Sequence, residues 1–184
     1  IGKLHDGDRL TELWATRDGR AWTCTLTAAA GQENCSGQGR VVRVTGRAAF
    51  SMAGRDLTFQ QIQDLPSDPD ALRERVAAML PAGSADLLAD ALSGLLWSKP
   101  SPPAVRAAAY RALADLPGVR YLGGRADPRG RAGEAFAYDL PAGVRRTLII
   151  DPATSQVLAG ADAGTGRSEV VLTAGWTDQP PHLP

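Results

Sequence analysis

The order of helix and strand patterns along the chain constrains its fold more than any other feature. Helix-start patterns occur in one central block, residues 65–117. In the blocks before and after it, residues 1–64 and 118–175, short alternating segments are separated by turns rich in Gly, Pro and Asp. No strand pattern alternates with a helix pattern as in a parallel βαβ unit. We therefore predict a single α+β domain with one curved antiparallel sheet, a half-barrel wrapped around about three helices.

The central block predicts three helices. A residue able to cap a helix is followed by proline at residues 67–69 and again at residues 101–103, and this pattern marks the start of the first and third helices. Ser84 is the predicted cap of the second helix. The second helix carries a wide apolar stripe that includes Leu88, Leu92, Leu95 and, at its end, Trp97. Such a stripe is expected to pack on the sheet.

The first block is predicted to consist of strands. Residues 10–16 and 21–27 flank Asp18 and Gly19, a dipeptide that favours a tight hairpin. Residues 40–50 alternate between apolar and polar side chains, which is typical of a half-buried strand. Residues 57–59 are predicted to add a short strand.

The last block is predicted to form an antiparallel meander, because short strands recur at even spacing with a turn after each. From residue 176 the chain is rich in proline, and we expect it to form a tail along the surface. The predicted strands are residues 119–126, 135–139, 147–150, 156–159 and 169–173.

Two cysteines, Cys24 and Cys35, lie eleven positions apart on either side of a polar turn. One interpretation is a disulfide between neighbouring strands, which would stabilise the domain by about 3 kcal/mol. It would also indicate an oxidising compartment outside the cytoplasm. The alternative is two unrelated buried thiols.

The charge balance excludes one class of partner. Lys and Arg together number 20, as do Asp and Glu, so the formal net charge is zero. A nucleic-acid-binding domain normally carries a basic face, so no nucleic-acid partner is expected. No apolar run approaches the roughly 18 residues of a membrane helix. Because the chain begins at Ile1, we expect it to be part of a longer protein in which any membrane anchor lies outside this sequence.

Residue patterns for catalysis or metal binding are missing from the sequence. It has no Gly-x-Ser-x-Gly motif and no phosphate-binding loop. Its two histidines, His5 and His182, lie near the chain ends and do not have zinc-ligand spacing with the cysteines. We therefore predict a protein that is not an enzyme and that uses no metal or other cofactor.

The apolar side chains leave two interpretations open. Trp14 and Trp22 are expected to face each other across the predicted hairpin. They either pack in a core or form the wall of an apolar pocket, and the same choice holds for the stripe of the second helix. The candidate lining residues of such a pocket are Trp14, Trp22, Leu88, Leu92, Leu95 and Trp97.

Several blocks of the sequence resemble an actinobacterial family of uncharacterised, membrane-anchored proteins. The blocks are residues 65–73, 102–114, 116–119, 146–154 and 174–177, mostly turns and helix caps. The resemblance implies an exported domain tethered to the cell membrane, often encoded beside an extracytoplasmic-function sigma factor. It also implies a fold similar to lipoprotein-carrier and sigma-regulator (LolA-like) domains. The family has no known catalytic residues, and it is not associated with the cysteine pair.

Two functions follow as hypotheses. The first is a non-enzymatic extracytoplasmic sensing or regulatory domain, which the family resemblance favours. The alternative is a carrier or binder of a lipid or lipoprotein acyl chain in an apolar cavity, which a curved sheet around leucine-rich helices favours. The expected partner is therefore an apolar ligand or another protein. A hydrolase is a third possibility without a motif behind it.

Overall fold

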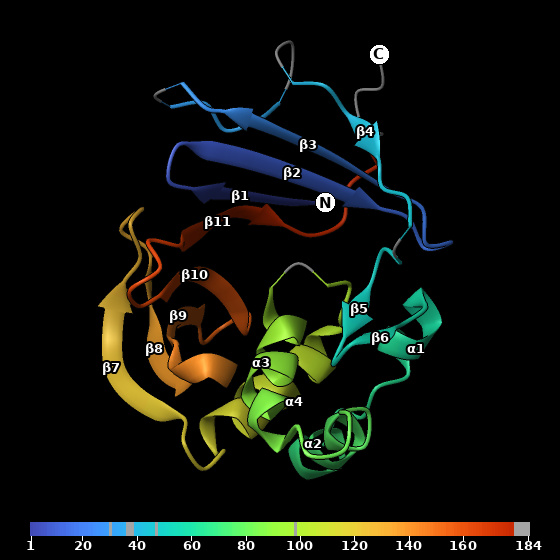
Figure 1. Ribbon diagram of the computed structural model, residues 1–184, viewed down its shortest axis with the longest axis vertical. Coiled ribbons are helices and arrows are strands. Elements are labelled where there is room, and N and C mark those ends of the chain that lie inside the picture. The colour runs from blue at the N-terminus through green and yellow to red at the C-terminus, as the bar shows by residue number, and fades with distance from the viewer. Residues whose placement is uncertain (30, 36–38, 47, 98, 179–184) are drawn as a thin grey trace.

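One large antiparallel sheet dominates the computed structural model, which describes residues 1–29, 31–35, 39–46, 48–97 and 99–178. Nine strands lie in the order β4-β3-β2-β1-β11-β10-β9-β8-β7. A few helices lie on one side of the sheet (Figure 1). The predicted α+β class with a large antiparallel sheet is confirmed, and the sheet is open.

The two strand blocks meet where the first strand pairs with the last. β1 pairs with β11 with a shift between Lys3 and Leu4, and all pairings in the sheet are antiparallel. The prediction that both blocks share one sheet is confirmed. Its strands are β1 (Gly2–Asp6), β2 (Arg9–Ala15), β3 (Ala21–Thr27), β4 (Val42–Arg43), β7 (Arg120–Ala126), β8 (Ala132–Asp139), β9 (Arg145–Asp151), β10 (Gln156–Asp162) and β11 (Ser168–Ala174).

The central block, residues 65–117, holds all the α-helices of the described residues except the first, which follows a small hairpin at the end of the first block. The hairpin consists of β5 (Ser51–Met52) and β6 (Arg55–Asp56). The helices are α1 (Phe59–Gln63), α2 (Pro69–Ala77), α3 (Leu88–Ser93) and α4 (Pro103–Ala114), and short 3-10 turns flank α3.

The helix starts follow the predicted caps only in part. Asp68 accepts a 2.9 Å hydrogen bond from the Ala71 amide and caps α2 as expected. Ser84 makes no capping hydrogen bond, and the predicted second helix is broken into a 3-10 turn, α3 and another 3-10 turn. The N-cap of α4 is Pro102, one residue after the serine expected there.

Two strand predictions in the first block were wrong. Among the described residues of 40–50, the strand is limited to Val42 and Arg43, which pair with β3 at the edge of the sheet. Residues 57–59 lead into α1, since Thr58 caps that helix and forms a reciprocal capping box with Gln61. Strand β1 and the β5–β6 hairpin were not predicted.

The main core lies between the helices and the inner face of the sheet. β7 to β10 bend around α3 and α4 (Figure 1), and the pairings β7–β8 and β9–β10 each contain a register shift. Such irregularities bend a strand and strengthen its twist. Fully buried residues from both layers meet there, among them Leu92, Leu95, Leu113, Leu148, Ile150 and Val157.

A second, smaller core covers the outer face of β2 and β3. Cys24 and Cys35 form a disulfide with a Cα–Cα distance of 6.5 Å, so the predicted bond is confirmed. It joins β3 to a loop residue and not to a neighbouring strand, because Cys35 lies in no strand and the next strand among the described residues, β4, begins at Val42. Trp14 and Val41 pack against the bond. The disulfide is compatible with an oxidising, extracytoplasmic location.

Removing the disulfide is expected to loosen this second core. A Cys24→Ala/Cys35→Ala variant should lose about 2–3 kcal/mol of unfolding free energy, because the bond closes a loop with a sequence separation of 11 residues. Urea denaturation with and without a reductant measures this loss. The reductant should shift the midpoint of the native protein but leave that of the variant unchanged. Two titratable thiols in the unreduced, denatured protein would contradict the assignment.

Candidate ligand-binding cavity

A cavity of about 470 Å³ lies where the ends of β1 and β2 approach α1 and the segment that leads into α4. This volume is within the range of small-molecule sites. Leu13 and Ala15 of β2 line it from the sheet. They alternate with Trp14, so the face of β2 that lines the cavity is opposite the face that covers the disulfide.

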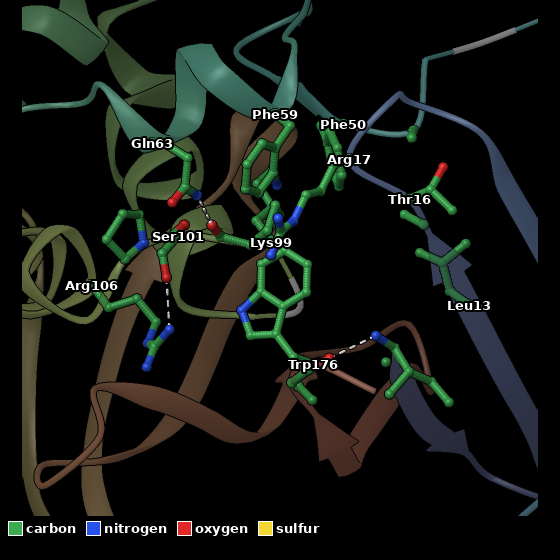
Figure 2. A pocket seen from close by; sticks show the side chains of 18 of the residues that line it. Leu13, Thr16, Arg17, Phe50, Phe59, Gln63, Lys99, Ser101, Arg106 and Trp176 are labelled. Carbon is green, nitrogen blue, oxygen red and sulfur yellow. Dashed lines mark hydrogen bonds between the residues drawn. The ribbon is translucent and has the colours of Figure 1, made fainter. Parts of the chain in front are cut away.

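Aromatic rings form the apolar wall of the cavity. Phe50 is buried, Phe59 lies on α1, and Trp176 follows β11. The rings of Phe59 and Trp176 meet edge to face with their centroids 5.7 Å apart. The Arg17 guanidinium lies over both rings, 5.7 Å from the first and 5.2 Å from the second (Figure 2). Because Trp176 is 63% exposed, this aromatic group forms the boundary between the cavity and solvent.

Every charged side chain among the described lining residues is a cation. They are Arg17, Lys99 and Arg106, and none of them forms an ion pair within the described part of the chain. Lys99 Nζ donates to the Gly94 carbonyl oxygen at 3.1 Å. Burial lowers the pKa of Lys99, with a smaller opposing effect from Asp90. Burial also lowers the pKa of Arg106. Both shifts reflect the cost of partly dehydrated, unpaired positive charge.

A buried hydroxyl lies beside these cations. Ser101 is 3% exposed, and its Oγ has no hydrogen-bond partner among the described residues. The carbonyl oxygen of Ser101 accepts a 2.7 Å hydrogen bond from Arg106 Nη1, and that of Pro100 accepts one from Gln63 Nε2 at 2.5 Å. The backbone of this segment is therefore tied down on both sides, while the serine hydroxyl stays unsatisfied.

The six predicted lining residues lie outside this cavity. Trp14 and Trp22 are opposite each other in the β2–β3 register, as predicted, but both belong to the core around the disulfide. Leu92 and Leu95 are fully buried in the main core, and half-buried Leu88 packs against that core. Half-buried Trp97 also packs against it and lies close to Gly160 of β10.

Sequence reasoning missed the residues that do line the cavity. Phe50, Phe59 and Trp176 come from segments predicted as strand, strand and tail, and Lys99 lies in a connection between helices. The proline pair after Ser101 does line the cavity, but in the sequence this pattern indicates only a helix start. The part of the predicted tail at residues 179–184 lies outside the described residues, as does His182.

A second polar group lies on the inner side of the sheet but is internally satisfied. Arg146 donates to both oxygens of Asp162, at 2.7 and 2.8 Å, and to Asp90 at 2.6 Å. The hydrogen bonds from Arg146 lower the pKa of Asp162. Burial raises the pKa of Tyr138 to about 12, and Tyr138 shares a 2.9 Å hydrogen bond with Ser93. We interpret this group as structural. Asp90, on α3, is thus an ion-pair partner of Arg146.

Comparisons with family models, with curated proteins and with solved structures found no match to this chain. Within the described ranges, no helix is long and apolar enough to cross a membrane. The same residues contain no group of three or more His, Cys, Asp or Glu side chains placed to hold a metal ion.

Proposed function

We propose that this chain is a non-enzymatic extracytoplasmic domain that binds an apolar or amphipathic small molecule in the cavity between the sheet and α1. The aromatic wall of Phe50, Phe59 and Trp176, open to solvent on one side, carries the proposal. Ligand sites are typically concave and mostly apolar, with a few polar groups that orient the ligand.

Binding of this kind suits either of two biological roles. A domain that senses a small molecule would pass its occupancy to a partner protein, and a carrier would release the molecule elsewhere. On the family resemblance we also propose that the domain is tethered to the cell membrane and has a LolA-like carrier fold. The same resemblance suggests an association with a sigma factor. The disulfide of the second core supports the extracytoplasmic part of it.

Hydrolysis fits the cavity less well than binding does. A general base must lie within hydrogen-bonding reach of the group that it activates. Ser101 is the buried hydroxyl of the cavity, yet the described lining contains no histidine and no carboxylate, and its amine, Lys99 Nζ, donates to the Gly94 carbonyl oxygen. His5 lies on β1 and bonds to the Gln32 carbonyl oxygen at 3.0 Å.

Ligand binding can be measured with the intrinsic tryptophan fluorescence, to which Trp176 in the cavity wall contributes. Long-chain amphiphiles added below their micelle concentration should change the emission in a saturable way, and native mass spectrometry should detect the same complexes. Phe59→Ala should weaken binding about tenfold, because it removes a ring of the wall and its contact with Trp176.

Tyr121→Ala is the matched control for the loss of an aromatic ring. Tyr121 is 60% exposed on the edge strand β7 and does not line the cavity. Its removal should leave the affinity unchanged. If none of the amphiphiles binds to the native protein, the proposed function is wrong.

A further inference from the structure

The charge inside the cavity differs from that of the whole molecule. The chain has no net charge, yet the described lining carries three cations and no anion. Elsewhere, buried or half-buried arginines such as Arg131 and Arg146 are paired with carboxylates. An unpaired charge with reduced hydration is costly unless a counter-charge is bound. The described side chains of the cavity provide no counter-charge for these cations, so an anion would have to come from a ligand.

The start of α4 adds to this positive potential. This twelve-residue helix has no side-chain cap at Pro102 and no acidic residue in its first turn. Pro102 and Pro103 both line the cavity, so the positive end of the helix dipole lies at its wall. The unpartnered, 3% exposed Ser101 hydroxyl lies immediately before this end and can donate a hydrogen bond.

Arg106 is positioned for an anion by its own backbone contacts. Its Nη1 donates to Ser101 O at 2.7 Å and its Nε to Thr154 O at 3.3 Å. These two bonds hold the guanidinium plane, and no bond of Nη2 to a described residue is found. A held guanidinium with free donors loses little freedom when it binds a carboxylate or phosphate.

Arg17 and Lys99 lie beside the aromatic rings, whereas Arg106 and Ser101 lie on one side of them, away from the apolar side chain of Leu13. Figure 2 shows Ser101 and Arg106 on one side, Leu13 on the other, and the rings of Phe59 and Trp176 between them. A ligand that satisfies both parts must have an apolar body and a charged end.

We infer that the ligand is an amphiphile with an anionic head group, a carboxylate or phosphate, and that Lys99, Ser101 and Arg106 bind this head group. This inference rests on the proposed function and specifies its ligand class. Ser101 Oγ donates to the head group, and the two cations provide the counter-charge. The apolar body lies against the aromatic wall.

A series of ligands with one chain length and different head groups tests the inference. Dodecanoate, dodecyl phosphate, dodecanol and dodecyltrimethylammonium are titrated below their micelle concentrations, and acetate and inorganic phosphate are added as head groups without a chain. The two anionic amphiphiles should bind at least about tenfold more tightly than dodecanol, because each gains charge-assisted hydrogen bonds. The cationic amphiphile should bind most weakly.

Variants locate the head group. Ser101→Ala and Arg106→Gln should each reduce the preference for dodecanoate over dodecanol about tenfold, while the affinity for dodecanol stays unchanged. Arg111→Gln, on an exposed position of the same helix, is the matched control and should change neither affinity. Ser101→Ala removes a buried hydroxyl that has no hydrogen-bond partner among the described residues, so this variant should fold. It therefore tests the inference even if Arg106→Gln does not fold.

The outcomes separate the inference from the proposed function. Equal affinities for dodecanoate and dodecanol, or equal effects of Arg111→Gln and Arg106→Gln, would overturn the inference and leave the proposed function standing. Binding of inorganic phosphate as tight as that of dodecyl phosphate would support the anion site and overturn the apolar part of the function. Failure of every amphiphile to bind would overturn both.

Discussion

Replacing Asp127 with alanine is expected to lower the free energy of unfolding by about 3–4 kcal/mol, because it breaks a buried ion pair. The Asp127 side chain is fully buried and accepts bonds from the backbone amides of Arg129 and Arg131, at 2.9 and 2.8 Å. It also accepts two bonds from the Arg131 guanidinium, at 2.8 and 2.5 Å.

Arg131 extends this contact to two further strands. Its Nη2 also donates to Leu158 O at 3.1 Å and to Val171 O at 2.7 Å, which ties the β7–β8 turn to β10 and β11. Without Asp127, the arginine would keep its charge in a partly buried place with no anion beside it. Chemical denaturation of the native protein and of Asp127→Ala measures the loss.

Asp139→Ala is the matched control. Asp139 also makes a two-bond contact with an arginine, Arg145, in the next hairpin, but both side chains are about half exposed. Exposed ion pairs contribute little to stability, so this variant should unfold close to the native protein. Equal losses from the two variants would show that burial is not the cause.

The same pair predicts a pH dependence. Burial acts to raise the pKa of Asp127, but the hydrogen bonds from Arg131 and the nearby amides outweigh it, so the pKa falls below its ordinary value. A carboxyl group with a lowered pKa in the folded state contributes its full stability above its unfolded pKa of about 4. This contribution is lost as the pH falls through the folded pKa. The stability difference between native protein and Asp127→Ala should therefore shrink in acid.

Leu92→Ala is expected to cost about 3–4 kcal/mol of unfolding free energy through the cavity left in the main core. Leu92 is fully buried on α3 and packs in the cluster shared with β9 and β10. The matched control is Leu88→Ala, one turn earlier on the same helix and only half-buried, which should cost clearly less. Denaturant midpoints measure both effects.

Ligand titration of the Leu92 variant separates core packing from ligand contact. Leu92 does not line the cavity near Trp176, so the fraction of Leu92→Ala that remains folded should bind amphiphiles as the native protein does. A loss of affinity at unchanged stability would instead assign Leu92 to a ligand site, as the sequence alone had allowed.

Sequence patterns predicted elements whose stability depends on near neighbours. The Asp18–Gly19 turn aligns Trp14 with Trp22, and Asp68 with Pro69 starts α2, because these contacts span only a few residues. The disulfide was inferred for a similar reason, since a short separation allows Cys24 and Cys35 to meet around one turn. The order of the blocks was enough for the antiparallel α+β sheet.

Strands whose partners are far away in the sequence were harder to predict. The segment that forms β1, Gly2–Asp6, contains mostly polar residues and shows no strand pattern. It is nevertheless a central strand, because β2 and β11 provide hydrogen-bonding partners on both sides. Residues 40–50 alternate well, but among the described residues of this range the pairing with β3 extends only over Val42 and Arg43, with one further hydrogen bond from the Val44 amide to Ala21 O. Alternation shows that a segment can be a strand, whereas pairing decides whether it is one.

The candidate site was decided by the tertiary structure alone. Leucines at helical spacing showed which face of a helix is apolar, and that face became the core. The cavity instead gathers Leu13, Phe59, Ser101 and Trp176 from four segments that are distant in sequence. Only Leu13 belongs to a periodic pattern, the alternation of β2, and that pattern does not mark a cavity. Their shared surface exists because the pairing of β1 with β11 brings Trp176 close to the first residues of the chain, beside the start of α4.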